Sequence, residues 1–140
     1  MELRVWEKEV DEQIIKIFMV PVLKDNYCYI VSWGKEALVI DPGEAAPVLK
    51  VLQDNELNLK TILNTHHHND HIAGNEEIKQ ALQVRVIGPS DVHIESVDQV
   101  VSDGEEIIIG LEAGIYSLKG IENVIKPITA HLLLLSYAKN

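Results

Sequence analysis

The chain of 140 residues contains a single cysteine, and this scarcity excludes an internal framework of disulfide bonds. Basic residues are also few, because 12 Lys and Arg stand against 22 Asp and Glu, which gives a net charge of −10. Clustered Lys and Arg recognise nucleic acid and anionic membranes, so neither is expected as a partner. No apolar run approaches the roughly 18 to 20 residues that span a bilayer, and the acidic N-terminal segment does not resemble a secretory signal. We therefore expect a cytoplasmic protein.

What the chain does have is enough apolar material for one core, with 46% hydrophobic residues. Runs rich in β-branched and aromatic residues alternate with stretches of helical periodicity, and no internal repeat is present. This alternation is typical of an α/β layered architecture. The predicted strands cover 14–22, 26–33, 36–43, 59–65, 84–89 and 105–109, and the predicted helices cover 45–57 and 75–83.

The segment NTHHHNDHIAGN holds four of the six histidines within six consecutive positions. If the preceding strand stays extended, His66 and His68 project to one side and His67 points away. Two imidazoles on one side form half of a site for a first-row metal. Asp70 and His71 follow where the chain turns into the next helix, so they would reach a second ion. This mixture of nitrogen and oxygen ligands suits zinc, iron or manganese in a hydrolytic centre.

Structural roles compete with this interpretation. Asp70 taken alone is equally well explained as a helix N-cap, and a single histidine is more often a packing or surface residue than a ligand. The close grouping favours metal, because four neighbouring imidazoles would repel one another when protonated. For His67, which points away from the other two, a structural role is the better interpretation. His93 and His131 have no partners nearby in the sequence and are expected to be structural or exposed.

Three stretches resemble one known family. THHHNDHIAGN is similar to the T-H-H-H-x-D-H-x-x-G-N signature of the metallo-β-lactamase superfamily, specifically its glyoxalase II branch, the hydroxyacylglutathione hydrolases. VLKDNYCYIV at 22–31 and ALVIDPGE at 37–44 resemble the first strands of that branch, and the likeness runs from about residue 14 to 109. Sulfur dioxygenase relatives usually lack the central histidine. His67 and the turn Asp25-Asn26-Tyr27 therefore favour glyoxalase II, with a sulfur dioxygenase or another metallo-hydrolase as the alternative.

The resemblance implies the N-terminal half of an αββα sandwich with a two-zinc centre, iron or manganese being alternatives. It assigns four ligands to the histidine segment: His66 and His68 for one ion, and Asp70 and His71 for the other. By the same resemblance Asp41 orients the ligand loop through hydrogen bonds, and His67 supports it from outside the metal shell. Asp70 is in addition the candidate catalytic residue.

The implied reaction is hydrolysis of a glutathione thioester. Its substrate would be S-D-lactoylglutathione, and its products glutathione and D-lactate. In such a centre two metal ions make a water molecule nucleophilic near neutral pH and stabilise the oxyanion that forms.

The C-terminal part departs from the family pattern. A complete centre needs seven protein ligands, and the histidine of a TPGHT or TPCHT turn, a bridging aspartate and a last histidine are not found. We divide the chain into a half domain at 1–110 and a non-family tail at 111–140, which a frameshift or splice variant would explain. We therefore expect weak metal binding, impaired hydrolysis, and self-association through a sheet face left in water. The alternatives are an inactive truncated product and a non-catalytic module that binds a partner.

Overall fold

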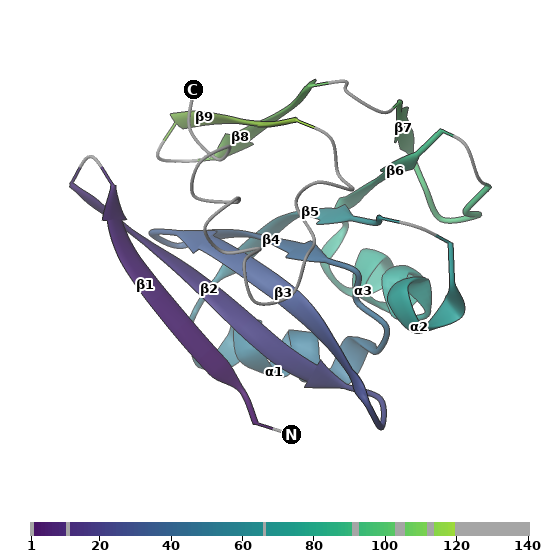
Figure 1. Ribbon diagram of the computed structural model, residues 1–140, viewed down its shortest axis with the longest axis horizontal. Helices are drawn as coiled ribbons and strands as arrows, with labels where there is room; N and C mark the ends of the chain where they lie inside the picture. The colour runs from purple at the N-terminus through teal and green to yellow at the C-terminus, as the bar shows by residue number, and fades with distance from the viewer. Residues whose placement is uncertain are drawn as a thin grey trace.

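The computed structural model describes residues 2–10, 12–65, 67–90, 93–102, 106–111 and 114–119. Strands and helices alternate there as the sequence predicts (Figure 1). The strands are β1 (Arg4–Val10), β2 (Gln13–Val22), β3 (Asn26–Trp33), β4 (Glu36–Ile40), β5 (Asn58–Leu63), β6 (Arg85–Pro89), β7 (Gln99–Val101), β8 (Glu106–Leu111) and β9 (Gly114–Lys119). The helices are α1 (Ala45–Asp54), α2 (Asn69–Ile72) and α3 (Asn75–Leu82).

One large mixed sheet organises the chain. Its strand order is β1-β2-β3-β4-β5-β6-β7, so neighbours in the sequence are neighbours in space. Pairing is antiparallel from β1 to β4 and parallel from β4 to β7. The parallel part begins where α1 carries the chain back between β4 and β5, since parallel neighbours need such a crossover. The prediction of an α/β fold is confirmed.

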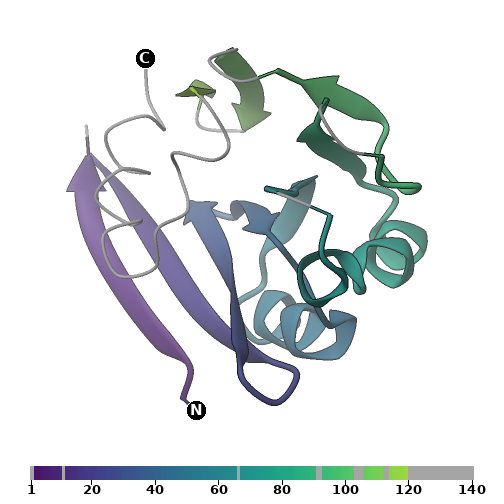
Figure 2. The ribbon, with the colours of Figure 1, turned by 45° about the vertical axis from the view of Figure 1, so that its right-hand side comes forward.

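The helices cover one face of this sheet. Buried side chains of α1, among them Val48 and Leu52, pack on alternate residues of β2, β3 and β4, such as Ile30 and Val39. Ile78 of α3 joins the same core and is fully buried. Figures 1 and 2 show α1 and α3 on this side and the β8–β9 hairpin on the opposite side. The packing of α3 in this layer places α3, and α2 just before it, near the ends of the parallel strands.

The second face of the sheet differs from the expectation. Its side chains alternate with those that meet the helices, and we expected them to be left in water. They are buried instead: Trp33, Leu38, Ile40 and Leu63 are each 1% exposed. These side chains are therefore not left in water, and self-association stays a prediction.

Several boundaries also differ from the sequence prediction. The helix expected to reach residue 57 ends at Asp54, and the unpredicted β1 lies at the edge of the sheet. β8 extends one residue past the expected domain boundary at residue 110 and pairs with β9. The division into two parts at that residue stays a prediction. In the described ranges, every helix is too short or too polar to cross a lipid bilayer.

Candidate metal centre

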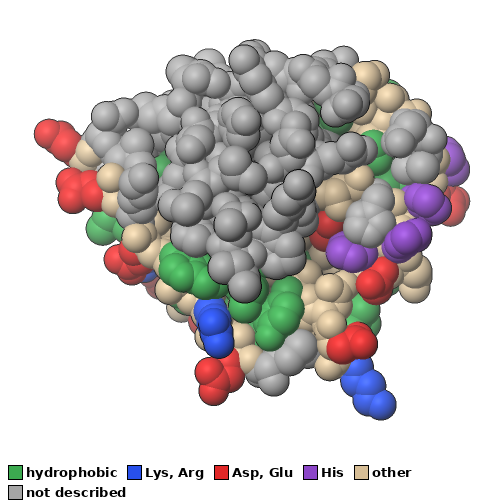
Figure 3. Space-filling model, in the orientation of Figure 1, with side chains coloured by type: hydrophobic (Ala, Val, Ile, Leu, Met, Phe, Trp, Pro, Cys, Tyr) green, Lys and Arg blue, Asp and Glu red, His purple; other side chains and the backbone are tan. Residues whose placement is uncertain are grey.

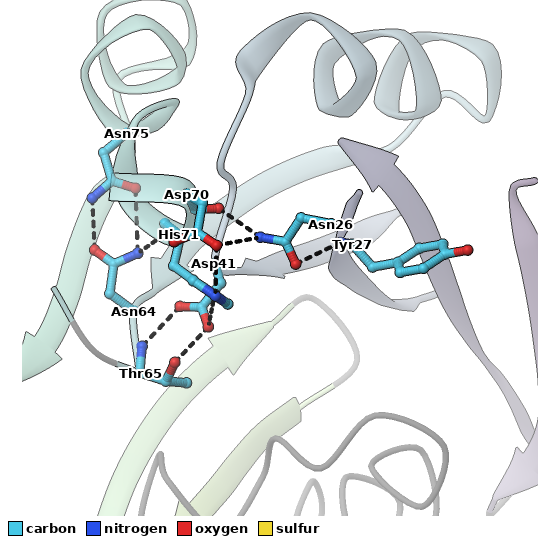
Figure 4. A network of polar contacts seen from close by, with 8 residues as sticks. All are labelled: Asn26, Tyr27, Asp41, Asn64, Thr65, Asp70, His71 and Asn75. Atoms are coloured by element: carbon cyan, nitrogen blue, oxygen red, sulfur yellow. Dashed lines mark hydrogen bonds and ion pairs between the residues drawn. The ribbon is translucent and has the colours of Figure 1, made fainter. Parts of the chain in front are cut away.

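The candidate centre lies at the carboxyl ends of two parallel strands. Asp41 follows β4 directly, and Asn64 and Thr65 follow β5. Because β4 and β5 pair in parallel, their carboxyl ends meet at one edge of the sheet, which is where open α/β sheets place their ligand sites. The loop after β5 leads into α2, which carries Asp70 and His71 to the same edge (Figure 4).

Asp41 organises this edge. Asp41 is 2% exposed, and its carboxylate accepts hydrogen bonds from the Thr65 backbone N–H, at 2.8 Å, and from the Thr65 hydroxyl. The same carboxylate lies 3.0 Å from Nδ1 of His71. Asp41 has a φ of 56°, a left-handed conformation that non-glycine residues adopt only when their surroundings fix it. The three contacts both satisfy the buried charge and hold this backbone conformation.

The contact with Asp41 fixes the orientation of His71. Its Nδ1 faces the Asp41 carboxylate, and Nε2 lies 3.6 Å from Oδ2 of Asp70. The hydrogen bond to Asp41 raises the pKa of His71 above its ordinary value, against the lowering effect of partial burial, and the charges of Asp41 and Asp70 add to the increase. A carboxylate behind a histidine is the common arrangement around metal-bound imidazoles.

The spacing of Asp70 and His71 is suitable for one metal ion. Two ligands that each lie about 2.1 Å from a tetrahedral zinc are about 3.4 Å apart. The observed 3.6 Å between Oδ2 of Asp70 and Nε2 of His71 is close to that separation. The donor set of one oxygen and one nitrogen also matches zinc and other first-row metals. These two side chains therefore fit a shared ion, and their ligand roles stay predictions.

The other histidines of the cluster are arranged differently from the extended strand that we assumed. β5 ends at Leu63, before the cluster, and His66 lies outside the described residues. His67 and His68 are exposed, and their rings meet edge to face with centroids 5.1 Å apart. Neighbouring side chains of a strand would point to opposite sides, so this contact follows from the loop conformation.

The structure bears on two of the structural alternatives. His68, and not Asp70, occupies the N-cap position of α2, so Asp70 lies in the first turn of that helix. His93 is exposed, as expected, and His131 lies outside the described residues. The described histidines gather on one side of the surface, next to acidic side chains (Figure 3).

Two buried asparagines close the histidine loop, and sequence analysis missed their role. Asn64 precedes the loop and Asn75 follows it, and both are fully buried. Their amides bond to each other in both directions, at 2.6 and 3.3 Å, and Asn75 also donates to Ser96 at 2.9 Å. The only signal in the sequence was an asparagine at each end of the segment. Together the two amides tie the start and the end of the loop to each other.

Two glycines allow the backbone segments to meet. A Cβ at Gly43 would overlap the carbonyl oxygen of Asp70, and one at Gly74 would lie 2.7 Å from the carbonyl oxygen of Pro42. The Gly74 N–H donates to that same Pro42 oxygen at 2.8 Å. The turn after β4 and the histidine loop are therefore in direct backbone contact, which a larger residue at either glycine would prevent.

The described side chains supply only part of a metal shell. Apart from His66, which the described ranges leave out, they form no cluster of three or more His, Cys, Asp or Glu that could hold an ion. Cys28 is fully buried, and burial raises the pKa of its thiol, so it is protonated at neutral pH and poorly suited as a ligand. Asp70 and His71 are therefore the best-placed pair.

Comparison with known proteins gives a consistent result. A family model described as the metallo-beta-lactamase superfamily matches residues 23–131. The hydroxyacylglutathione hydrolase of Klebsiella pneumoniae is 35% identical over 76% of this chain and 43% of its own length. That of Edwardsiella ictaluri is 41% identical over 71% of this chain and 41% of its own length. The chain thus spans about two fifths of the length of the curated relatives that it matches.

A solved structure shows the same fold and confirms the predicted architecture, part of a metallo-β-lactamase sandwich. The crystal structure of the BLEG-1 B3 metallo-beta-lactamase superposes with a TM-score of 0.58 at 19% sequence identity. The likeness covers 66% of this chain and 54% of the other. At this identity the comparison concerns the arrangement of strands and helices and not the chemistry.

Proposed function

Because the chain belongs to the metallo-β-lactamase superfamily, we propose that its histidine loop forms half of the two-metal centre of a glutathione thioester hydrolase. The contact that carries the proposal is the one from Asp41 to Nδ1 of His71, which turns Nε2 toward the Asp70 carboxylate. The substrate class follows from the curated relatives, which are named hydroxyacylglutathione hydrolases.

Each loop residue has a stated place in the proposal. Asp70 and His71 would hold one ion, and His66 and His68 would hold the other. A metal ion of this kind makes water a competent nucleophile for the thioester carbonyl near neutral pH. The chain's own contribution is to place the proton of the neutral His71 ring on Nδ1, where Asp41 accepts it, so that Nε2 is the nitrogen directed at the ion.

Metal titration tests the proposal directly. Zn²⁺ and Co²⁺ should bind the chain weakly, and a chelator should remove them, because a stable zinc site has four protein ligands and the loop offers two for each ion. His71→Ala and Asp70→Ala should each abolish binding of the ion that these two residues share and leave the ion assigned to His66 and His68. His93→Ala is the matched control, since His93 is an exposed histidine outside the loop. Binding that is equal in all four proteins would refute the proposal.

Hydrolysis of S-D-lactoylglutathione tests the half-site character. With two ligands per ion, we expect turnover close to that of the same metal in solution, and His71→Ala should change it little. Strong turnover that His71→Ala removes would show that the chain, alone or as an oligomer, completes the centre. That result would retain the hydrolase assignment and refute the half site.

A further inference from the structure

The turn between β2 and β3 contacts the candidate metal centre. Asn26, the first residue of β3, directs its side-chain amide at Asp70 (Figure 4). Nδ2 donates to the Asp70 backbone carbonyl at 2.9 Å and to Oδ2 of its carboxylate at 3.3 Å. The other end of the amide, Oδ1, accepts the Tyr27 backbone N–H at 2.9 Å. Both ends of the Asn26 side chain are therefore engaged.

The turn that carries Asn26 is itself fixed. At its start, Leu23 has a φ of 56° and donates its backbone N–H to Oε1 of Glu44 at 2.7 Å. Glu44 directly precedes α1 and follows Gly43. A Cβ at Gly43 would meet both the Asp70 carbonyl and the Leu23 side chain. The turn at Leu23, the segment 43–44 and Asp70 thus meet around one glycine. These contacts help to fix the position of Asn26, in addition to its own hydrogen bonds.

The Asp70 carboxylate needs such a partner. Its side chain is 53% exposed, so without a fixed neighbour it would sample several rotamers. Asn26 donates to the same oxygen, Oδ2, that lies 3.6 Å from Nε2 of His71. An amide group with two N–H donors can bond both the carbonyl and the carboxylate of one residue, whereas an aspartate in its place could bond neither.

We propose that Asn26 is a positioning residue that holds the Asp70 carboxylate beside His71 in the geometry of a shared metal ion. The inference rests on the proposed function, because it assigns to Asn26 the task of orienting one of its ligands. It also assigns a role to the turn Asp25-Asn26-Tyr27, which sequence analysis used only as a feature of family resemblance. Asn26 touches no reacting atom, so its effect passes through Asp70.

The test begins with the metal-free protein. The side-chain amide resonances of Asn26 in a ¹H–¹⁵N NMR spectrum should shift when Asp70 is changed to Ala, since the carboxylate acceptor is lost. The amide of Asn55, which donates to the Val51 carbonyl at 2.8 Å at the end of α1, should not shift. If the Asn26 resonances do not move, the contact is absent and the inference is overturned.

The second measurement uses Co²⁺, whose visible absorption reports ligand geometry. Asn26→Ala should weaken Co²⁺ binding about tenfold, the lower end of the usual loss when a group that orients a ligand is removed, and should change the absorption bands. Asn55→Ala is the matched control: a half-buried asparagine with one amide-to-carbonyl bond, whose loss should leave Co²⁺ binding and spectrum unchanged.

The outcomes separate the two proposals. If His71→Ala abolishes binding of one Co²⁺ ion while Asn26→Ala leaves the affinity and spectrum as in the unmodified chain, the inference fails and the proposed function stands. If Co²⁺ binding does not depend on His71, the proposed function fails and the inference with it. Weaker binding in Asn26→Ala with unchanged bands would indicate a general loss of structure and would also overturn the positioning role.

Discussion

The two ends of β4 differ in how many hydrogen bonds their polar side chains make. At the carboxyl end, Asp41, Asn64 and Asn75 are at most 2% exposed, and each makes two or more side-chain hydrogen bonds. At the amino end, near the last turn of α1, the buried Glu36 pairs with the exposed Lys60 at 3.4 Å, and Lys35 forms a surface pair with Glu56. The side chains of Lys35 and Glu56 are 59% and 83% exposed.

This difference indicates that the carboxyl end of β4 is shaped by function as well as by stability. A buried polar group costs free energy unless all its hydrogen bonds are made, whereas an exposed ion pair contributes little either way. A cavity of about 410 Å³ lies at the amino end, and Lys16 and Lys35 are among its lining residues. Both lysines pair with glutamates, so their charges are already balanced and do not indicate a ligand site. The carboxyl end keeps a buried carboxylate in a left-handed conformation, which is typical of a functional site.

Of the substitutions that test this comparison, the removal of Asp41 should lower the free energy of unfolding the most. Asp41→Ala leaves the Thr65 N–H and hydroxyl and the His71 ring without their buried acceptor, so unfolding free energy should fall by about 3 kcal/mol. Asp54→Ala removes an exposed carboxylate from the surface pair with Lys50 in α1 and should cost about 0.5 kcal/mol or less. Urea denaturation of the metal-free proteins measures both. Equal losses would show that the two ends do not differ in this way.

Most of the strand pattern was predictable because runs of β-branched residues are typical of buried strands. The prediction for β3, residues 26–33, agrees with the structure, and the predicted helix 75–83 ends one residue early, at Leu82. β1 was not predicted, because RVWEKEV is rich in charge and forms a strand only through its pairing with β2 at the sheet edge. Tertiary pairing of this kind leaves no local signal in the sequence.

The candidate site was predictable only in part. The histidine cluster is visible as a motif, and Asp41 was connected with it through family resemblance. The reciprocal pair of Asn64 and Asn75 was not, since two asparagines eleven positions apart carry no periodic signal. Likewise, the contact between Asn26 and Asp70 spans 44 positions and depends on how two turns approach each other.

Substitution in the pair Asn64 and Asn75 should give the second largest loss in the free energy of unfolding. Asn75→Ala removes the two hydrogen bonds between Asn75 and the buried Asn64 amide and should lower the free energy of unfolding by about 2 kcal/mol. Asn64→Ala should do the same, and the double variant should lose about 1 kcal/mol less than the sum, because the shared bonds are lost only once. A double-mutant cycle by urea denaturation measures this coupling. Strict additivity would contradict the reciprocal pair.

Two glycines sharpen the comparison further. Gly43→Ala places a Cβ against the Asp70 carbonyl, so it should cost about 1.5 kcal/mol through displaced backbone and also weaken Co²⁺ binding. Gly34 lies at the other end of β4, between β3 and β4, with a φ of 59° and open space around it. Gly34→Ala should cost about 1 kcal/mol through backbone strain alone and leave Co²⁺ binding unchanged. Weaker Co²⁺ binding in Gly34→Ala would contradict the separation of the two ends.

The smallest effect concerns Asp98, which is intermediate between the two ends because it is partly exposed but well bonded. Lys79 donates to its Oδ1 at 2.6 Å, and the Val86 backbone N–H donates to its Oδ2 at 2.8 Å. The hydrogen bond from Lys79, followed by the one from Val86, lowers the pKa of Asp98 below its ordinary value. A pKa that is lower in the folded than in the unfolded chain stabilises the fold above the unfolded value of about 3.9. This contribution is lost as the pH falls from there through the folded pKa.

Asp98→Asn removes this carboxylate and keeps its size. The variant should therefore be slightly less stable than the unmodified chain at pH 7, and the difference should shrink as the pH falls below about 4. Because the Asp98 side chain is 42% exposed, salt screens its attraction to Lys79, and high NaCl should also narrow the difference at pH 7. Urea denaturation at several pH values measures it. A difference that widens toward low pH would mean that the carboxylate is destabilising in the folded chain, with the Lys79 bond too weak to offset its burial.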